Sequence, residues 1–159
     1  MDDSVWVWLL WAWFAAWALA LTRVDLREHR LPNRMVAIAL AGCVLITVFR
    51  FAASGNATVV VGAALGSVVA VAFFAAAHYV GGVGMGDVKY AAVTGWMLGT
   101  IGWSAVWWGH FAGFVLAGCV VLVGWLVRAW NRRTAVPFGP FMGLGAIAVG
   151  GLGALGGLT

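Results

Sequence analysis

The chain has 159 residues, of which 64% are hydrophobic and 9% are charged, and its net charge is +4. Soluble domains carry about a quarter charged residues, and a chain of this size cannot bury so much apolar side chain in one core. The composition therefore excludes an ordinary soluble domain and predicts a membrane protein. On such a chain a small positive charge indicates cytoplasmic loops rather than a surface that binds nucleic acid.

Six apolar runs divide the chain, each near the length of about 20 residues that an α-helix needs to cross a bilayer. In chain order the runs are 5–22, 35–53, 58–80, 88–101, 104–127 and 137–158. The first run follows two aspartates rather than a basic segment, so we expect a retained helix and not a signal peptide. We therefore expect an all-α, polytopic membrane protein of about six transmembrane helices, forming a single domain over residues 1–159.

The basic residues predict the orientation of these helices. Eight of the nine lie at alternate connections between the runs, and only Arg50 lies on the other side. The eight are Arg23, Arg27, Arg30 and Arg34 after the first run, Lys89 at the start of the fourth, and Arg128, Arg132 and Arg133 after the fifth. Because lysine and arginine concentrate in cytoplasmic loops, both termini are expected to be extracytoplasmic. The arginines are also expected to contact anionic lipid.

Glycines four residues apart recur in three of the runs. The pairs are Gly62 and Gly66, Gly95 and Gly99, and Gly109 and Gly113. This spacing places both glycines on one face of a helix, where the backbone of a neighbouring helix can approach closely. We expect these pairs to mark helix contacts and to carry no chemistry.

Acidic residues are scarce, and two of the five lie at predicted membrane boundaries. Asp25 follows the first run and Asp87 precedes the fourth, so both are expected at the same cytoplasmic depth, whereas Asp2, Asp3 and Glu28 are expected at the surface. A carboxylate that faces lipid is costly, so both boundary aspartates should face the bundle interior or water. Two carboxylates in contact share a proton and can act as base and acid together, which is the chemistry of aspartic proteolysis.

Glycines surround the second of these aspartates in the stretch GGVGMGDVKYA. Gly84 and Gly86 leave the backbone uncovered, so a substrate peptide could lie against it, and they permit a positive φ or a sharp start to the helix. The alternative is that Asp87 only caps a helix N-terminus. Lys89 either steadies the charge of the site or marks the inner membrane interface.

Two further stretches are expected at the same cytoplasmic level. VDLREHRLPN begins its motif at Asp25, and Pro32 fits the first turn of the second helix while Asn33 fits a turn or cap. AVPFGPFMGLGA opens the sixth run, where Pro137 and Pro140 give a stiff start to the helix.

The three motifs D-x5-[IL]-P-N, G-x-G-D-x-K and P-F-G-P-F, in this order, resemble those of the type IV prepilin leader peptidases, which are GxGD-type intramembrane aspartic proteases. The resemblance covers the chain from Asp25 to about Gly145 and implies that Asp25 and Asp87 are catalytic. It implies cleavage after a glycine, at the cytoplasmic face of the cytoplasmic membrane, of the basic leader of a prepilin or pseudopilin. The residues implied to bind substrate or to support the site are Gly84, Gly86, Lys89, Pro32, Asn33, Pro137, Phe138, Gly139 and Pro140.

The expected partners are this substrate and membrane lipid, without nucleic acid, metal or cofactor. Longer members of the family carry a cytoplasmic insertion with paired CxxC motifs and also N-methylate the new amino terminus. This chain has no such insertion, so we do not expect it to transfer methyl groups. The alternatives to a peptidase are a small proton-coupled membrane transporter and a catalytically inactive pilus assembly factor.

Overall fold

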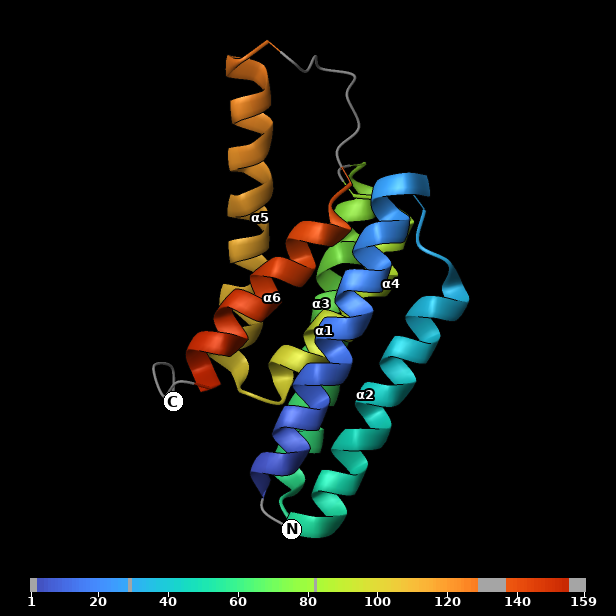
Figure 1. Ribbon diagram of the computed structural model, residues 1–159, viewed down its shortest axis with the longest axis vertical. Helices are drawn as coiled ribbons and strands as arrows, with labels where there is room; N and C mark the ends of the chain where they lie inside the picture. Colours follow the sequence, from blue (N-terminus) through green and yellow to red (C-terminus); the bar gives the residue numbers. More distant parts are fainter. Residues whose placement is uncertain (1–2, 29, 82, 129–136, 155–159) are drawn as a thin grey trace.

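A computed structural model of the protein describes residues 3–28, 30–81, 83–128 and 137–154. Over these residues the chain is helical and contains no strand. The six helices are α1 (Asp3–Glu28), α2 (Asn33–Ser54), α3 (Ala57–Tyr79), α4 (Met85–Gly99), α5 (Trp103–Leu126) and α6 (Gly139–Ala154). They pack side by side in an elongated bundle (Figure 1). The prediction of an all-α protein is confirmed for this part of the chain.

Each predicted apolar run corresponds to one of these helices. α1, α2, α3 and α5 are long and apolar enough to cross a membrane, whereas α4 has 15 residues and α6 has 16. These four helices support the prediction of a helical membrane protein. The number of six crossings and the position of the termini stay predictions.

Two helices extend past their apolar runs and take in the boundary aspartates. α1 continues to Glu28, and α4 begins at Met85. Asp25 therefore lies in the last turn of α1 and Asp87 in the first turn of α4, at the helix ends where the sequence predicted them. Backbone hydrogen bonding continues a helix whether its side chains are apolar or polar, so the helix ends do not coincide with the ends of the hydrophobic runs.

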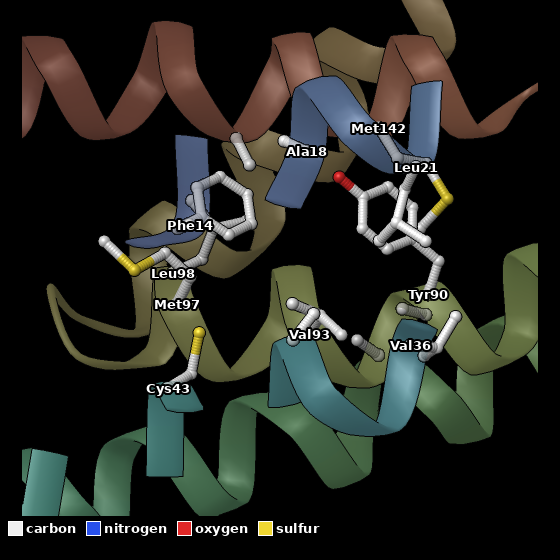
Figure 2. Close-up of a cluster of buried hydrophobic side chains, with 14 of the residues drawn as sticks. Phe14, Ala18, Leu21, Val36, Cys43, Tyr90, Val93, Met97, Leu98 and Met142 are labelled. Carbon is white, nitrogen blue, oxygen red and sulfur yellow. The ribbon is translucent and has the colours of Figure 1, made fainter. Parts of the chain in front are cut away.

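α4 lies at the centre of the bundle, where it contacts α2, α3, α5 and α6. Its side chains Tyr90, Val93 and Met97 are fully buried, in a cluster that includes Phe14 of α1 and Cys43 of α2 (Figure 2). The first turn of α4, which carries Asp87, is therefore fixed by a helix whose other turns are packed on several sides.

Glycines bring the backbones of neighbouring helices together, as their spacing predicted. A Cβ atom added to Gly95 of α4 would lie 2.5 Å from the carbonyl oxygen of Gly66 in α3, and one added to Gly62 would lie 2.6 Å from the carbonyl oxygen of Gly99. On α5, a Cβ at Gly113 would lie 3.0 Å from a backbone oxygen of α6. These interfaces hold α3 against α4 and α5 against α6.

An ion pair that the sequence analysis missed joins α1 to α2 at the opposite end of the bundle from Asp25. Nε and Nη2 of Arg50 each donate a hydrogen bond to the carboxylate of Asp3, at 2.7 Å. Arg50 thus has an acidic partner on its own side of the protein. The two residues are 47 positions apart, so no local pattern indicated the contact.

The close approach of α3 and α4 leads to a prediction on stability. Gly95→Ala places a methyl group against the backbone of Gly66 and should lower the free energy of unfolding by about 1–3 kcal/mol, because a packed helix pair must separate to admit it. Gly118→Ala in α5 is the matched control, since no atom lies within 4 Å of the added carbon. Thermal unfolding in detergent, followed by circular dichroism, compares the two variants. Equal stability would contradict backbone contact between α3 and α4.

Candidate active site

A cleft with a volume of about 610 Å³ opens at the end of the bundle where α1 ends and α4 begins. Residues from the last turn of α1, the α1–α2 connection, the start of α4 and the segment that leads into α6 line the cleft. They are Asp25, Arg30, Leu31, Asn33, Gly84, Met85, Gly86, Asp87, Lys89, Pro137 and Phe138. All three sequence motifs therefore meet at one place. Of the predicted site residues, only Pro32, Gly139 and Pro140 do not line it directly.

Asp25 is buried because it continues the inward face of α1. The buried residues of this helix are Leu10, Phe14, Ala18, Leu21 and Asp25, at intervals of three or four residues. This is the helical spacing of one face, so the carboxylate follows four apolar side chains into the bundle, where it is only 6% exposed. Glu28, three residues later, is exposed. The sequence prediction that Asp25 faces the interior is thus met by the structure, as is the surface position of Glu28.

Asp87 is positioned by the start of α4 and is not the N-cap residue of this helix. Gly84 occupies the N-cap position with φ −72° and ψ 150°, and its carbonyl oxygen accepts hydrogen bonds from the N–H groups of Asp87 at 3.1 Å and Val88 at 3.3 Å. Asp87 is thus the third residue of the helix, and the alternative that it is the N-cap residue is wrong. Gly84 provides a sharp start to the helix with an ordinary negative φ, so no positive φ is required there.

The two carboxyl groups interact electrostatically. The pKa of Asp87 is raised to about 6: burial is the largest cause, the nearby charge of Asp25 acts in the same direction, and a hydrogen bond from the Gly84 backbone opposes the shift. Both raising effects act by disfavouring the charged form of the side chain. Asp87 therefore keeps its proton to a higher pH than an exposed aspartate, and the pair can hold one proton between them.

The start of α6 approaches Asp25 closely at a glycine, Gly139. A Cβ atom added to Gly139 would lie 2.7 Å from Oδ2 of Asp25. The side chain of Leu31 lies close to both neighbouring helices, 3.7 Å from that added carbon and 3.4 Å from one added to Gly86. Leu31 therefore packs between the starts of α4 and α6. Pro140 lies in the first turn of α6, where a missing backbone N–H is tolerated.

A hydrogen bond joins two of the motifs across the mouth of the cleft. Nζ of Lys89 donates to Oδ1 of Asn33 at 2.7 Å, so this side chain joins the second turn of α4 to the first residue of α2. The expected roles of Pro32 and Asn33 are exchanged in the structure. Pro32 is the N-cap residue of α2 and Asn33 is its first helical residue, with no side-chain cap. The amide of Asn33 is held by Lys89 instead of by the backbone of its own helix.

Three residues of the cleft were not predicted as site residues: Arg30, Leu31 and Met85. Leu31 could have been found, since it is the apolar residue in a polar connection and a member of the D-x5-L-P-N motif. His78 was also missed. Its Nδ1 lies 2.7 Å from the carbonyl oxygen of Val83 and can donate a hydrogen bond to it, which anchors the segment just before Gly84 to the last turn of α3.

The fold and the site together define a class: a helical membrane protein in which aspartates from two helices share one cleft at the helix ends. A model of the type IV leader peptidase family matches residues 12–127. The chain belongs to this family, and the family indicates a protease. The matched residues include Asp25 and Asp87 but end before Pro137, so the segment leading into α6 is placed at the cleft by the structure. No curated protein and no solved structure gave a match.

The interaction between the two carboxyl groups can be tested directly. Asp25→Asn removes one charge, so the pKa of Asp87 should fall, while burial should keep it above the value of an exposed aspartate. Infrared titration of protein with ¹³C-labelled aspartate measures this shift through the carboxyl stretch. Glu28→Gln, at an exposed position on the same helix, is the control and should leave the titration of Asp87 unchanged. An unchanged pKa in Asp25→Asn would show that the two groups do not interact.

Proposed function

We propose that the protein is an aspartic endopeptidase that removes the leader of a prepilin or a pilin-like protein by cutting after a glycine at the cytoplasmic face of the cytoplasmic membrane. The observation that carries the proposal is the meeting of Asp25 and Asp87 in one cleft, with the charge of one acting on the other. Membership of the leader peptidase family supports the choice of substrate. The position of both carboxyl groups at helix ends, beside an open cleft, fits a peptidase better than a transporter with a site at the membrane midplane.

The proposed reaction divides the work between the two carboxyl groups. Asp25, as the carboxylate, accepts a proton from a water molecule while the water oxygen attacks the scissile carbonyl carbon. Asp87, which retains its proton more readily, donates it to the carbonyl oxygen. Collapse of the tetrahedral intermediate transfers the proton on Asp25 to the leaving amine and returns a hydroxyl proton to Asp87. Asp25 is then again a carboxylate and Asp87 is again protonated. The peptide bond has been replaced by a carboxyl group and an amine.

The exposed backbone at the start of α4 is the proposed site for the substrate chain. Gly84 is exposed in the cleft and has no side chain to cover its backbone. A Cβ added there would lie 3.3 Å from Oδ2 of Asp87, so a larger residue would crowd the carboxylate as well as the peptide. Gly139 is buried and lets the start of α6 lie against Asp25, where an added Cβ would crowd that carboxyl group.

The first test is cleavage by variants of the pair. Asp25→Asn and Asp87→Asn should each lower prepilin cleavage at least about a hundredfold, since each removes an acid–base group. The double variant should be no worse than either single variant, because groups that act as one unit are not additive. Glu28→Gln is the control and should cleave normally. Processing is scored by the mass of the product at matched membrane abundance. Substantial cleavage by either single variant would refute the two-aspartate reaction.

The dependence of cleavage on pH provides a second test. Below about pH 6 Asp87 holds its proton, so activity should fall as the pH rises through this value and the acid is lost. At much lower pH both carboxyl groups are protonated and no base remains, so the profile should be bell-shaped. Initial rates measured across the pH range on a synthetic substrate determine the two limbs. A rate that stays constant from pH 5 to pH 8 would contradict the proposed role of Asp87.

The proposed orientation has six crossings and extracytoplasmic termini, as the distribution of basic residues supports. It places the α3–α4 connection in the cytoplasm. Alkaline phosphatase, which is active only outside the cytoplasm, should therefore be active when fused after Asn56 or Thr159 and inactive when fused after Gly81. Activity at Gly81 would reverse the orientation and place the cleft outside the cytoplasm.

A further inference from the structure

The hydrogen bond between Lys89 and Asn33 determines which end of the Asn33 amide faces the lysine. Nζ of Lys89 lies 2.7 Å from Oδ1 of Asn33. An ammonium group only donates hydrogen bonds, so the carbonyl end of the amide faces Lys89 and the NH2 end points away from it. An asparagine amide without such a partner can present either end, so the lysine selects one of two orientations.

The NH2 group of Asn33 is available to a ligand in the catalytic cleft. Asn33 and Lys89 both line the cleft, and both side chains are exposed. Among the residues that the structure describes, Nδ2 of Asn33 has no hydrogen-bond acceptor. The amide does not cap α2 either, because Pro32 is the N-cap residue of that helix. A donor group of fixed orientation therefore lies at the wall of the cleft without a partner from these residues.

The chemistry of this group fits the carbonyl oxygen of a peptide bond. An NH2 group of an amide donates hydrogen bonds, and a backbone carbonyl oxygen accepts them. An extended peptide carries one carbonyl group per residue, at intervals of about 3.4 Å along the chain. The cleft has a volume of about 610 Å³ and also contains Asp25 and Asp87. A peptide whose scissile bond lies beside these aspartates consequently carries further carbonyl groups along the walls of the cleft.

We propose that Nδ2 of Asn33 donates a hydrogen bond to a backbone carbonyl oxygen that flanks the scissile bond of the substrate, and that Lys89 is a positioning residue that orients the amide. The inference rests on the proposed peptidase function. Because the acceptor belongs to the main chain, the contact does not depend on the side chains of the substrate. The carbonyl group does not react, so its loss should raise KM more than it lowers kcat.

Asn33→Asp distinguishes this role from a purely structural one, because the two roles predict opposite effects. The carboxylate keeps the shape of the side chain and an acceptor for Lys89, and a negative charge is favourable at the start of α2. A residue that only joined α2 to α4 would tolerate this change without loss of activity. In the proposed role an acceptor replaces the donor, so KM should rise at least about tenfold, with a smaller effect on kcat.

Arg34→Gln is the matched control for Asn33→Asp. Arg34 is the adjacent residue of α2, is exposed and lies outside the lining of the cleft. Its replacement by glutamine changes the net charge of the protein by the same amount as Asn33→Asp. KM should stay at the wild-type value in this variant, and initial rates on a synthetic peptide that spans the cut measure both constants. Equal KM values in Asn33→Asp and the wild-type protein would overturn the proposal.

Variants of Lys89 test whether the lysine acts through the amide. Lys89→Met should raise KM about twofold if both orientations of the Asn33 amide become equally populated, since only one of them binds. Lys89→Arg keeps a side chain that only donates and should restore most of the wild-type KM. In the Asn33→Ala background, Lys89→Met should have no further effect, because the amide that it orients is absent. The same increase in both backgrounds would refute the positioning role.

Modified peptides test whether the contact is made with the main chain. In a series of peptides, each amide near the cut is replaced in turn by an E-alkene, which has no carbonyl oxygen. One member should bind about tenfold less tightly than the unmodified peptide to the wild-type protein and show no such loss with Asn33→Ala. A series with the same losses in both proteins would contradict a hydrogen bond from Asn33 to the substrate backbone.

Binding to an inactive protein separates the failure of this proposal from the failure of the proposed function. In the Asp87→Asn background, a fluorescent peptide with a basic leader and a glycine at the cut should bind at least about tenfold less tightly when Asn33→Asp is added. Arg34→Gln should not change this affinity. Such weakened binding, without any cleavage by the wild-type protein, would support the role of Asn33 and refute the peptidase. Normal cleavage with an unchanged affinity in Asn33→Asp would refute the role of Asn33 alone.

Discussion

The repulsion between Asp25 and Asp87 is the interaction on which the rest of the site depends. Two carboxyl groups brought together in a largely apolar chain disfavour each other's charge, and burial adds to the effect. The arrangement persists only because each group is fixed on a helix that is held elsewhere. Four apolar residues precede Asp25 on the inward face of α1, and α4 is packed on several sides below Asp87. The electrostatic cost at the cleft is therefore offset by packing deeper in the bundle, where no ionisable pair is involved.

The segment that opens α6 contacts both the catalytic cleft and the aromatic side chains between α3 and α5. Gly139 lies against Asp25, while the ring of Phe138 packs at a tilt against Phe74 and Phe114. A displacement of this segment would therefore alter the space beside a carboxyl group and the packing of these rings at the same time. This dual contact gives a physical reason for the combination of glycine, proline and phenylalanine in one short motif. Glycine permits the approach, proline starts the helix, and phenylalanine fills the space between helices.

Much of the fold could be predicted from the sequence because its signals are local. Apolar runs indicated the helices, glycine spacing indicated the close α3–α4 contact, and the position of Asp25 and Asp87 at the ends of runs indicated a common site. The incorrect predictions concern side chains whose partners are distant in the sequence. Asn33 was expected to cap its own helix, but it binds Lys89, 56 residues away.

The features that escaped prediction also depend on tertiary contacts. The Asp3–Arg50 pair joins residues 47 positions apart, and the contacts among the rings of Phe74, Phe114 and Phe138 join three separate segments. Composition and periodicity carry no information on such pairings, because they describe one segment at a time. Leu31 is an intermediate case. Its apolar character in a polar connection was visible in the sequence, but its place between Gly86 and Gly139 was not.

The shortness of α4 has a consequence for the supply of water to the reaction. Its 15 residues give a helix about 22 Å long, whereas the hydrocarbon core of a bilayer is about 30 Å thick. α4 is enclosed by α2, α3, α5 and α6, so the difference in length is met inside the bundle rather than by the surrounding lipid. If α4 crosses from the far surface of the bilayer, its first turn, which carries Asp87, lies below the near surface, and water reaches it through the cleft that Asp87 lines. The length of a single helix would then set how far below the membrane surface hydrolysis can take place.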